Sequence, residues 1–456
     1  MITSAAFHGK RYAILGLARS GLAAAQALLA SGARITAWDR QDIARAALTD
    51  AVSEGRAELA DPLALDLTGY DGVVVSPGVP LNTHPIAAHA ARYGVPVIGD
   101  IELFALARSS LPPHRIVGVT GTNGKSTTTA LIQHMCKEAG LPSLMGGNIG
   151  LPIMAQPALE PNQNGDAVYV LELSSYQIDL TYNLDCDIGI LLNISPDHLD
   201  RYDSFDAYAA AKARLFSMMG PGSPAIISGA DQKSLDIMQA LGAAGRADDV
   251  VDLSHLPDAD QRRWPALQGP HNLQNALVAA SAGHALGISD ADLHRALESF
   301  AGLPHRMEIV AEHAGVTFIN DSKATNQASS APALAAYPPS PDKRVHWIVG
   351  GLAKEDGLGE CARYLGNVAA AYTIGESGPR FAELLEGTVT VHKAELLCEA
   401  VVRAVRNAKT GDVVLLSPAC ASFDQFRDYE KRGEHFRQIV SALTHDRPPA
   451  GAAHEQ

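Results

Sequence analysis

The segment Thr120-Gly-Thr-Asn-Gly-Lys-Ser126 has the composition of a phosphate-binding loop and follows the apolar run Arg115–Val119. Its two glycines allow backbone N–H groups to turn toward phosphate oxygens, and the start of the expected next helix adds positive potential. Lys125 is expected to reach the β- and γ-phosphates of a nucleotide, and the Ser126 hydroxyl to reach Mg²⁺. Val119 stands where the usual motif has its first glycine, so a plain N-capped turn is the alternative.

Polar side chains that suit a metal ion follow two further apolar runs. Glu172 lies at the end of Val168–Leu173, and Asp197 and His198 come just after Ile188–Asn193. Ligands of parallel sheets bind at the carboxyl ends of the strands. A carboxylate with a neutral histidine suits a Mg²⁺ ion that keeps several waters. Alone, His198 would more often be a surface or core histidine; together with the phosphate loop it indicates a metal ligand.

A second glycine-containing turn, Gly16-x-Ala18-x-x-Gly21, follows the N-terminal apolar run Arg11–Leu15. It is similar to a dinucleotide-binding fingerprint in which alanine replaces the second glycine, and Asp39 is placed like a ribose-binding carboxylate. The signature is weak by itself. A nicotinamide-dependent dehydrogenase, a non-redox nucleotide site and plain packing are all consistent with it.

Three polar loops follow expected strands in the last third of the chain: Asn320–Asn326 (NDSKATN), Gly350–Lys354 (GGLAK) and Ser417–Phe423 (SPACASF). Each alone is as consistent with a capped turn as with a binding site. If all three loops lie at the carboxyl edge of one sheet, they predict a concave polar site there.

The elements that must position these loops alternate as short apolar runs and Ala-rich helical stretches. This alternation predicts an α/β fold with doubly wound parallel sheets. A length of 456 residues predicts roughly three domains, with breaks near Ser109–Pro113 and Gly302–Pro304. Further expected elements are the strands Arg34–Trp38, Gly72–Val75, Val95–Ile98, Ala225–Ser228, Val316–Asn320, Val345–Val349, Tyr372–Gly375, Val389–Val391 and Val413–Ser417, and the helix His271–Leu286.

The composition narrows the class of protein further. Lys and Arg number 36 and Asp and Glu 50, a net charge of −14 that argues against a nucleic-acid binder. The five cysteines form no C-x-x-C pair, which indicates reduced thiols in a cytoplasmic protein. Neither a signal peptide nor an apolar run long enough to cross a membrane is found in the sequence. We therefore expect a cytoplasmic protein without membrane insertion.

Motifs along nearly the whole chain resemble those of the Mur ligases. The phosphate loop is common to that family and to the folylpolyglutamate synthetases, whereas NDSKATN and LSPACASFDQF favour the members that add D-glutamate. The DNPR motif typical of members that add diaminopimelate or lysine is not found. The other matching motifs are SPGV at Ser76–Val79, GDIELF at Gly99–Phe104, GGNIG at Gly146–Gly150, LELSSYQ at Leu171–Gln177, DHLDRY at Asp197–Tyr202, AAKARLF at Ala210–Phe216, GPHNLQNA at Gly269–Ala276 and GLPHRME at Gly302–Glu308.

The resemblance implies three domains: a Rossmann-like UDP-sugar-binding domain at 1–105, a central ATPase domain with a P-loop-type parallel sheet at 106–303, and a Rossmann-like amino-acid-binding domain at 304–456. It also implies a reaction in peptidoglycan precursor synthesis. ATP phosphorylates the L-alanyl carboxylate of UDP-N-acetylmuramoyl-L-alanine, and the amine of D-glutamate attacks the acyl phosphate. The resemblance implies that this reaction requires Mg²⁺. We expect the protein to be a monomer.

The resemblance also assigns roles to single residues. Lys125, His198 and Lys212 would be catalytic. Nucleotide binding would involve Gly121, Thr122, Asn123, Gly124, Lys125, Ser126, Thr127, Asn272, Asn275, Arg306 and Asp321. The Mg²⁺ ligands would be Ser126, Glu172, His198 and a carbamylated Lys212. Ser76 and Asn148 would touch the UDP-sugar, and D-glutamate would be held by Thr325, Lys354, Ser422, Phe423 and Tyr429.

Two departures from the family pattern leave the detailed UDP contacts open: Ala18 replaces a frequent glycine, and Arg40-Gln41 follows Asp39 in place of a common Thr-Arg pair. The alternatives in function are another Mur-type ligase or a folylpolyglutamate synthetase, a dehydrogenase that uses the first glycine loop, and a non-enzymatic nucleotide-gated interaction module. The dehydrogenase leaves the second glycine loop unexplained, and the module would need neither His198 nor Glu172.

Overall fold

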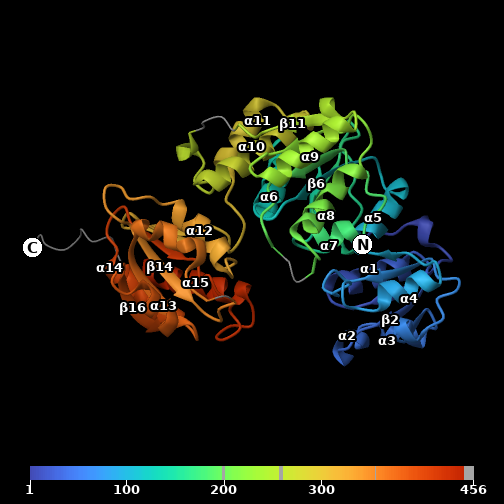
Figure 1. Cartoon of the computed structure of the whole chain (residues 1–456), viewed down its shortest axis with the longest axis horizontal. Coiled ribbons are helices and arrows are strands. Elements are labelled where there is room, and N and C mark those ends of the chain that lie inside the picture. The colour runs from blue at the N-terminus through green and yellow to red at the C-terminus, as the bar shows by residue number, and fades with distance from the viewer. Residues whose placement is uncertain (198–200, 256–259, 355, 446–456) are drawn as a thin grey trace, which may run out of the picture. The chain divides into compact units, whose positions relative to one another are not determined.

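Three β-sheets organise the chain, as the computed structural model shows for residues 1–197, 201–255, 260–354 and 356–445. The chain divides into two units, one formed by Met1–Asp258 with Gln274–Ala296 and the other by Ala259–Leu273 with Leu297–Gln456. The first unit holds two sheets and the second unit holds one. Helices connect the strands of each sheet (Figure 1). The predicted three-domain α/β class is confirmed.

The N-terminal sheet is parallel throughout, with strand order β3-β2-β1-β4-β5. Because the chain winds outward in both directions from the centre, the loops after β1 and β4 lie side by side at the switch point, where ligands of such sheets bind. The strands are β1 (Arg11–Leu15), β2 (Arg34–Trp38), β3 (Ala57–Leu59), β4 (Gly72–Val75) and β5 (Val97–Ile98). The helices are α1 (Arg19–Ala30), α2 (Asp42–Ala46), α3 (Thr49–Ser53), α4 (Ile86–Arg92) and α5 (Asp100–Ala107).

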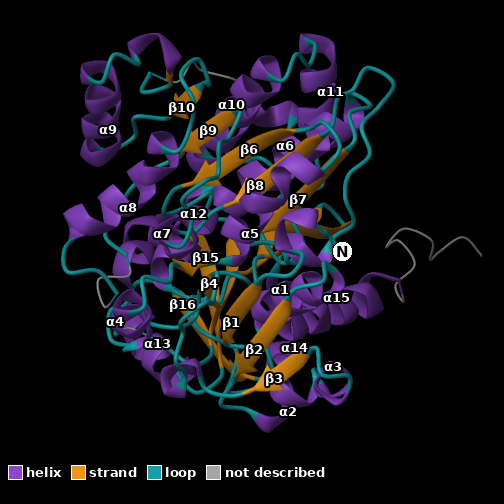
Figure 2. Cartoon of the chain, turned by 90° about the vertical axis from the view of Figure 1, so that its right-hand side faces the viewer, coloured by secondary structure: helices purple, strands orange, loops and turns teal. Residues whose placement is uncertain are grey.

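The central sheet is also parallel and has the order β11-β10-β9-β6-β8-β7. Figure 2 shows β9, β6, β8 and β7 side by side, so the loops that follow β6, β8 and β9 are neighbours. The strands are β6 (Arg115–Thr120), β7 (Ser143–Gly147), β8 (Val168–Glu172), β9 (Ile188–Leu191), β10 (Ala225–Ile227) and β11 (Val250–Asp252). The helices are α6 (Lys125–Glu138), α7 (Ser175–Asp179), α8 (Phe205–Ser217), α9 (Gln232–Ala243), α10 (Pro270–Ala285) and α11 (Asp290–Ser299).

The C-terminal sheet has the order β12-β13-β17-β14-β15-β16 and departs from the expected parallel arrangement at one edge. There β12 pairs antiparallel with β13, because Ala314 and Gly315 both adopt positive φ (51° and 75°) and reverse the chain in a tight hairpin. The strands are β12 (Glu308–His313), β13 (Val316–Asn320), β14 (Val345–Gly350), β15 (Val368–Ile374), β16 (Thr390–Glu395) and β17 (Val413–Leu416). The helices are α12 (Gln327–Ala335), α13 (Gly378–Leu385), α14 (Leu397–Asn407) and α15 (Tyr429–His445).

The two sheets of the first unit share one apolar core. Phe104 of α5 packs edge-on against Tyr169 of β8, with ring centroids 5.0 Å apart. The buried Glu102 of α5 accepts hydrogen bonds from the backbone N–H groups of Tyr182 (2.7 Å) and Asn183 (3.0 Å) after α7. The N-terminal and central sheets are therefore joined by a buried carboxylate as well as by apolar packing.

Two further sequence expectations concern the chain as a whole. All five cysteines are free thiols, and four of them are buried. In the part of the chain that the structure describes, every helix is too short or too polar to span a bilayer.

Candidate active site

The predicted phosphate loop connects β6 to α6 at the switch point of the central sheet. Gly121 (φ 148°) and Gly124 (φ 87°) adopt conformations that other residues rarely reach. A Cβ added to Gly124 would lie 2.3 Å from Oδ1 of Asn275 on α10. Asn275 is buried, and its Oδ1 accepts a hydrogen bond from the Thr128 hydroxyl (3.3 Å). Two residues predicted to bind nucleotide, Gly124 and Asn275, therefore pack against each other.

The residue after β9 fixes the shape of this loop. The backbone oxygen of Asn193 accepts a hydrogen bond from the Thr122 N–H (2.7 Å), and its side-chain oxygen accepts one from the Asn123 N–H (2.8 Å). The hydroxyls of Thr122 and Tyr208 lie 3.1 Å apart. Asn193 was expected only as the end of a strand; its side chain is a positioning group that the local sequence pattern does not reveal.

The amines of Lys125 and Lys212 converge on the loop. Nζ of Lys125 donates to the carbonyl oxygens of Gly121 (2.9 Å) and Thr122 (2.8 Å). Nζ of Lys212, on α8, donates to the same Gly121 oxygen at 2.9 Å. The Lys212 side chain is only 1% exposed. Burial, and then the positive charge of Lys125, lower the pKa of Lys212 well below its usual value, which favours the neutral amine.

Glu172 and Asn148, predicted for different ligands, meet at the ends of β8 and β7. Oε1 of Glu172 accepts a hydrogen bond from the Asn148 side chain (3.0 Å), and the Asn148 N–H donates to the Glu172 backbone oxygen (2.8 Å). A Cβ on Gly147 would lie 2.2 Å from that backbone oxygen, so glycine permits the contact. The buried Oε2 of Glu172 accepts no hydrogen bond from any residue that the structure describes.

The donor set fits a magnesium ion. A buried carboxylate oxygen without a hydrogen-bond donor is costly unless a cation binds it, and the Ser126 hydroxyl is a second hard oxygen ligand of the kind Mg²⁺ prefers. Within the described ranges, no group of three or more His, Cys, Asp or Glu side chains could hold a metal ion; Mg²⁺ commonly keeps several waters instead. The Lys212 amine donates to a carbonyl and cannot ligate a metal in that form. His198 lies outside the described residues.

At the N-terminal switch point, Ser76 packs against the first glycine loop. Its hydroxyl donates to the carbonyl oxygen of Gly16 (3.0 Å), whose φ is 90°. The carboxylate of Asp39 accepts hydrogen bonds from the backbone N–H groups of Leu17 (2.7 Å) and Gln41 (2.9 Å). In this structure Asp39 therefore holds the loop backbone, a role that the ribose hypothesis did not include.

In the second unit, the charge of Arg306 acts on Asp321. Asp321 follows β13 and is buried; its carboxylate accepts hydrogen bonds from the Ser417 hydroxyl (2.7 Å) and the Met307 N–H (3.2 Å). Burial raises the pKa of Asp321 to about 7, against the opposing effects of the Ser417 hydrogen bond and the Arg306 charge. Nη1 of Arg306 is buried and has no hydrogen-bond partner among the described residues. Asn272, also predicted for the nucleotide, donates to the Gln268 carbonyl (3.1 Å).

The predicted amino-acid-binding residues lie on the three polar loops of the C-terminal sheet and at the start of α15. Nζ of Lys354 donates to the Thr325 hydroxyl (3.3 Å), which joins two of these loops. Ser422 is buried, whereas Phe423 is 70% exposed. The Tyr429 backbone oxygen accepts a hydrogen bond from the Ser322 hydroxyl (2.8 Å). Because β17 lies between β13 and β14, the three loops are adjacent.

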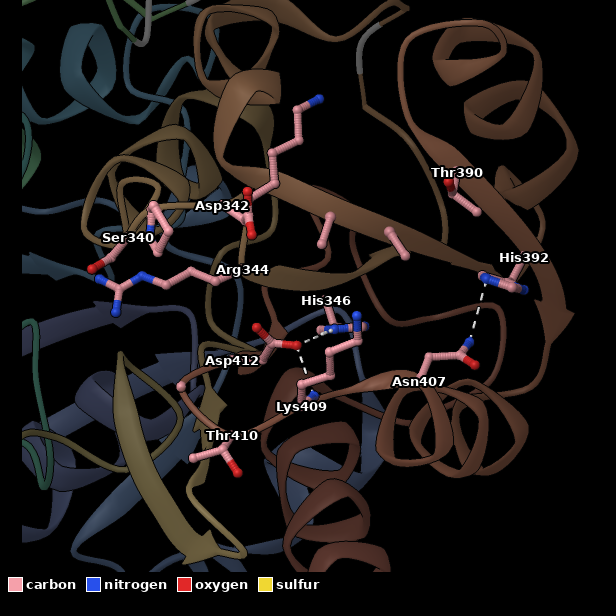
Figure 3. Close-up of a pocket in the computed structure, with 15 residues that line it drawn as sticks. Ser340, Asp342, Arg344, His346, Thr390, His392, Asn407, Lys409, Thr410 and Asp412 are labelled. Carbon is pink, nitrogen blue, oxygen red and sulfur yellow. Dashed lines mark hydrogen bonds and ion pairs between the residues drawn. The ribbon is translucent and has the colours of Figure 1, made fainter.

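A cavity of about 520 Å³ lies at the other edge of this sheet, where the strands begin. Its lining includes His346, His392 and Asp412, drawn in Figure 3. Asp412 pairs with His346 (3.1 Å) and accepts a hydrogen bond from the Lys409 N–H (2.8 Å). The predicted site residues all lie outside this lining, so the cavity is separate from the candidate active site.

Comparison with known proteins assigns all three sheets to one family. Residues 10–99 match the MurD-like N-terminal domain of Mur ligases, residues 119–262 the Mur ligase middle domain, and residues 305–420 the Mur ligase glutamate ligase domain. The chain is 60% identical to UDP-N-acetylmuramoylalanine–D-glutamate ligase of Novosphingobium aromaticivorans, covering 98% of each chain. It is 56% identical to the ligase of the same name from Sphingopyxis alaskensis, covering 97% of this chain and 100% of that one.

Among solved structures, UDP-N-acetylmuramate–alanine ligase of Thermotoga maritima shares the fold, with a TM-score of 0.57 and 18% identity over 96% of this chain and 100% of that one. The domain matches, the relatives that cover nearly the full length and the shared fold all agree with the resemblance inferred from the motifs. The chain belongs to the Mur ligase family.

Proposed function

We propose that this protein joins D-glutamate to UDP-N-acetylmuramoyl-L-alanine in an ATP-dependent reaction of peptidoglycan precursor synthesis, and thereby serves cell shape and division. The observation that carries the proposal is the phosphate loop on which the amines of Lys125 and Lys212 converge. The names of relatives at 60% and 56% identity supply the substrates.

The reaction has two steps. A carboxylate oxygen of the L-alanyl group attacks the γ-phosphorus of ATP, and the bond to the β-phosphate oxygen breaks to release ADP. The uncharged amine of D-glutamate then attacks the acyl carbon of the acyl phosphate. The tetrahedral intermediate collapses to the amide and inorganic phosphate, and the amine proton is lost to solvent.

The phosphate loop supplies binding and charge for the first step. Turning Lys125 from the Gly121 and Thr122 carbonyls to the γ-phosphate would place a cation where negative charge is transferred. Gly121, Thr122, Asn123, Gly124, Ser126 and Thr127 would hold the phosphates, and Asn275 would maintain the loop through its contact with Gly124. Asn272, Arg306 and Asp321 would complete nucleotide binding.

Family membership implies ATP and Mg²⁺. Mg²⁺ would neutralise charge on the transferred phosphoryl group, and Ser126, Glu172 and His198 would hold it. Support comes from the buried Oε2 of Glu172, which has no donor among the described residues.

Lys212 is proposed to be carbamylated. Its neutral amine would attack CO₂ to give a carbamate and release one proton, which converts a nitrogen donor into an anionic oxygen ligand. Burial and the adjacent Lys125 charge support the proposal, because both favour the neutral amine that this reaction needs.

The C-terminal loops are proposed to bind D-glutamate. Lys354 and Thr325 would meet one carboxylate, Ser422 the other, and Phe423 and Tyr429 would cover the carbon chain. In the N-terminal sheet, Ser76 would contact the UDP-sugar, as would Asn148 at the end of β7. We further propose a cytoplasmic monomer with domains at 1–105, 106–303 and 304–456.

The test is phosphate release from ATP by the full chain with UDP-N-acetylmuramoyl-L-alanine, with and without D-glutamate. Release that requires both substrates, with formation of the amide product, is expected. Comparable release with lysine, diaminopimelate or a folate substrate would instead identify another ligase of this group, and NAD binding without ATP hydrolysis would identify a dehydrogenase.

A further inference from the structure

Arg432 of α15 is buried beneath the polar loops of the C-terminal sheet. Its side chain is 1% exposed and makes four hydrogen bonds. Nε donates to the Ser322 hydroxyl (3.0 Å), Nη2 to the backbone oxygens of Ser322 (2.9 Å) and Cys420 (3.0 Å), and Nη1 to that of Ala421 (3.3 Å). One guanidinium therefore links the loop after β13 to the loop after β17.

The third loop is attached to the same framework. Leu352 and Ala421 exchange backbone hydrogen bonds of 2.9 Å in both directions, which joins the loop after β14 to the loop after β17. A Cβ on Gly351 would lie 2.4 Å from the Ala421 oxygen and 3.2 Å from Nη1 of Arg432. Glycine at 351 therefore gives the guanidinium its space.

Each linked loop carries a residue assigned above to D-glutamate. Thr325 lies three residues after Ser322, Lys354 two residues after Leu352, and Ser422 immediately after Ala421. The guanidinium itself is too buried to be a surface contact for a substrate. Its hydrogen bonds fix the backbone from which these three side chains project.

The charge of Arg432 is not neutralised by a direct ion pair. Every partner of its hydrogen bonds is an uncharged oxygen, and no Asp or Glu oxygen lies within 4.0 Å among the residues that the structure describes. Burial lowers its pKa to about 10, so the group stays protonated near neutral pH. Asp424 and Asp321 act on this charge only from beyond 4.0 Å, so the hydrogen bonds to uncharged oxygens are what fix the guanidinium.

We propose that Arg432 is a positioning residue of the amino-acid site: its hydrogen bonds hold the three loops in the register that the D-glutamate-binding side chains need. This inference rests on the proposed function, since it concerns the second substrate of that reaction. Lysine cannot replace the group, because three donors on one nitrogen cannot reach oxygens that the planar guanidinium meets from three nitrogens.

The test compares Arg432→Lys and Arg432→Met with Arg437→Met. Arg437 lies on the same helix and pairs with Glu308, which also accepts a hydrogen bond from Asn320 at the start of the first loop (3.1 Å). Its loss therefore removes a helix-docking contact and leaves the links to the loops after β14 and β17 intact. For Arg432→Lys we expect the KM for D-glutamate to rise about tenfold or more, as for a lost set of charged hydrogen bonds. The KM values for ATP and for the UDP-sugar substrate should change by less than about twofold.

Hydrogen exchange gives a readout that does not depend on catalysis. Amides of residues 320–326 and 417–423 should exchange faster in Arg432→Lys than in wild type, and those of residues 417–423 should be unchanged in Arg437→Met. If Arg432→Met does not fold, the lysine variant still decides the question.

The outcomes separate the two proposals. A wild-type chain that does not ligate D-glutamate overturns the proposed function. A wild type that ligates it, with an unchanged D-glutamate KM and unchanged loop exchange in Arg432→Lys, overturns only the role of Arg432. Equal rises of all three KM values in Arg432→Lys and in Arg437→Met would show a general loss of structure and would also overturn it.

Discussion

The amines of Lys125 and Lys212 donate hydrogen bonds to one and the same oxygen, the carbonyl of Gly121, each at 2.9 Å. Two ammonium groups that share one acceptor repel each other, which favours the neutral form of the more buried group. Lys212 is the more buried, and the lowered pKa of its side chain follows. The arrangement distinguishes the two lysines, because the buried amine of Lys212 is the one whose neutral form is favoured.

Replacing Lys125 by alanine should abolish ligation and leave the fold intact. The side chain lies at the first residue of α6 and is only partly buried, so its removal creates no core cavity, yet it removes a charge from the transferred phosphoryl group. We expect kcat to fall about a hundredfold or more. The melting temperature of the variant checks that the fold is intact. Lys137→Ala, an exposed lysine of the same helix, is the control; near-normal turnover of Lys125→Ala would contradict the ATP-site assignment.

Replacing Lys212 by alanine should leave little activity, and small carboxylates such as formate or acetate should restore part of it by occupying the vacated ligand position. Lys212→Arg should be no better than alanine, because a guanidinium keeps its charge and cannot form a carbamate. Activity assays with and without added acetate measure both effects.

Two results would argue against the carbamate. The first is full activity of Lys212→Arg. The second is an intact-mass or crystallographic measurement that finds an unmodified Lys212 beside bound Mg²⁺ in active protein.

The amino-acid site should prefer D-glutamate to L-glutamate, lysine and diaminopimelate. With both carboxylates held, only one enantiomer directs its amine toward the acyl phosphate. Lys354→Ala should raise the KM for D-glutamate about tenfold, as for a lost charged contact. Lys343→Ala, an exposed lysine in the separate cavity of Figure 3, should not change it. Comparable turnover with L-glutamate or lysine would show that the substrate assignment is wrong.

Asp321 should make the stability of the C-terminal sheet fall as pH rises toward neutrality. Because the pKa of Asp321 is raised from 3.8 to about 7, the folded protein keeps a proton that the unfolded chain releases between these values. Unfolding then releases a proton, and the free energy of unfolding decreases with pH by up to about 1.4 kcal/mol per unit in this window and levels off above it.

The measurement is the melting temperature of wild type and Asp321→Asn from pH 5 to pH 7. Asp321→Asn has no carboxyl to titrate at this position, so its stability relative to wild type should increase with pH across this window. Asp248→Asn, at an exposed position, is the control. A constant difference between Asp321→Asn and wild type would show that Asp321 does not titrate there.

Much of the fold follows from local sequence, because buried parallel strands are continuous apolar runs. The expected ranges Arg11–Leu15, Arg34–Trp38, Gly72–Val75 and Val316–Asn320 coincide with β1, β2, β4 and β13. Four strands were not expected: β3, β7, β11 and β12. Their segments are short or mix polar with apolar residues, and each lies at a sheet edge, where one side has no strand neighbour and less apolar surface is buried.

The candidate site could be predicted from sequence where it depends on residue type within a short motif, as in the predicted phosphate loop. The motif does not predict that Asn193 would hold that loop or that Asn148 would bond to Glu172, since these contacts join residues far apart in the sequence. The same limit applies to Arg432, whose surrounding sequence resembles a solvated helix face. Sequence pattern shows which groups are present, and the strand order decides which of them meet.

The common core of the N-terminal and central sheets has a consequence for how the chain can be divided. A fragment that ends at residue 105 would leave Phe104 without Tyr169 and the buried Glu102 without the N–H groups of Tyr182 and Asn183. Such a fragment would expose the apolar surface that Phe104 and its neighbours bury, so it would tend to aggregate. The N-terminal sheet is therefore separable in sequence but not as an independently stable protein.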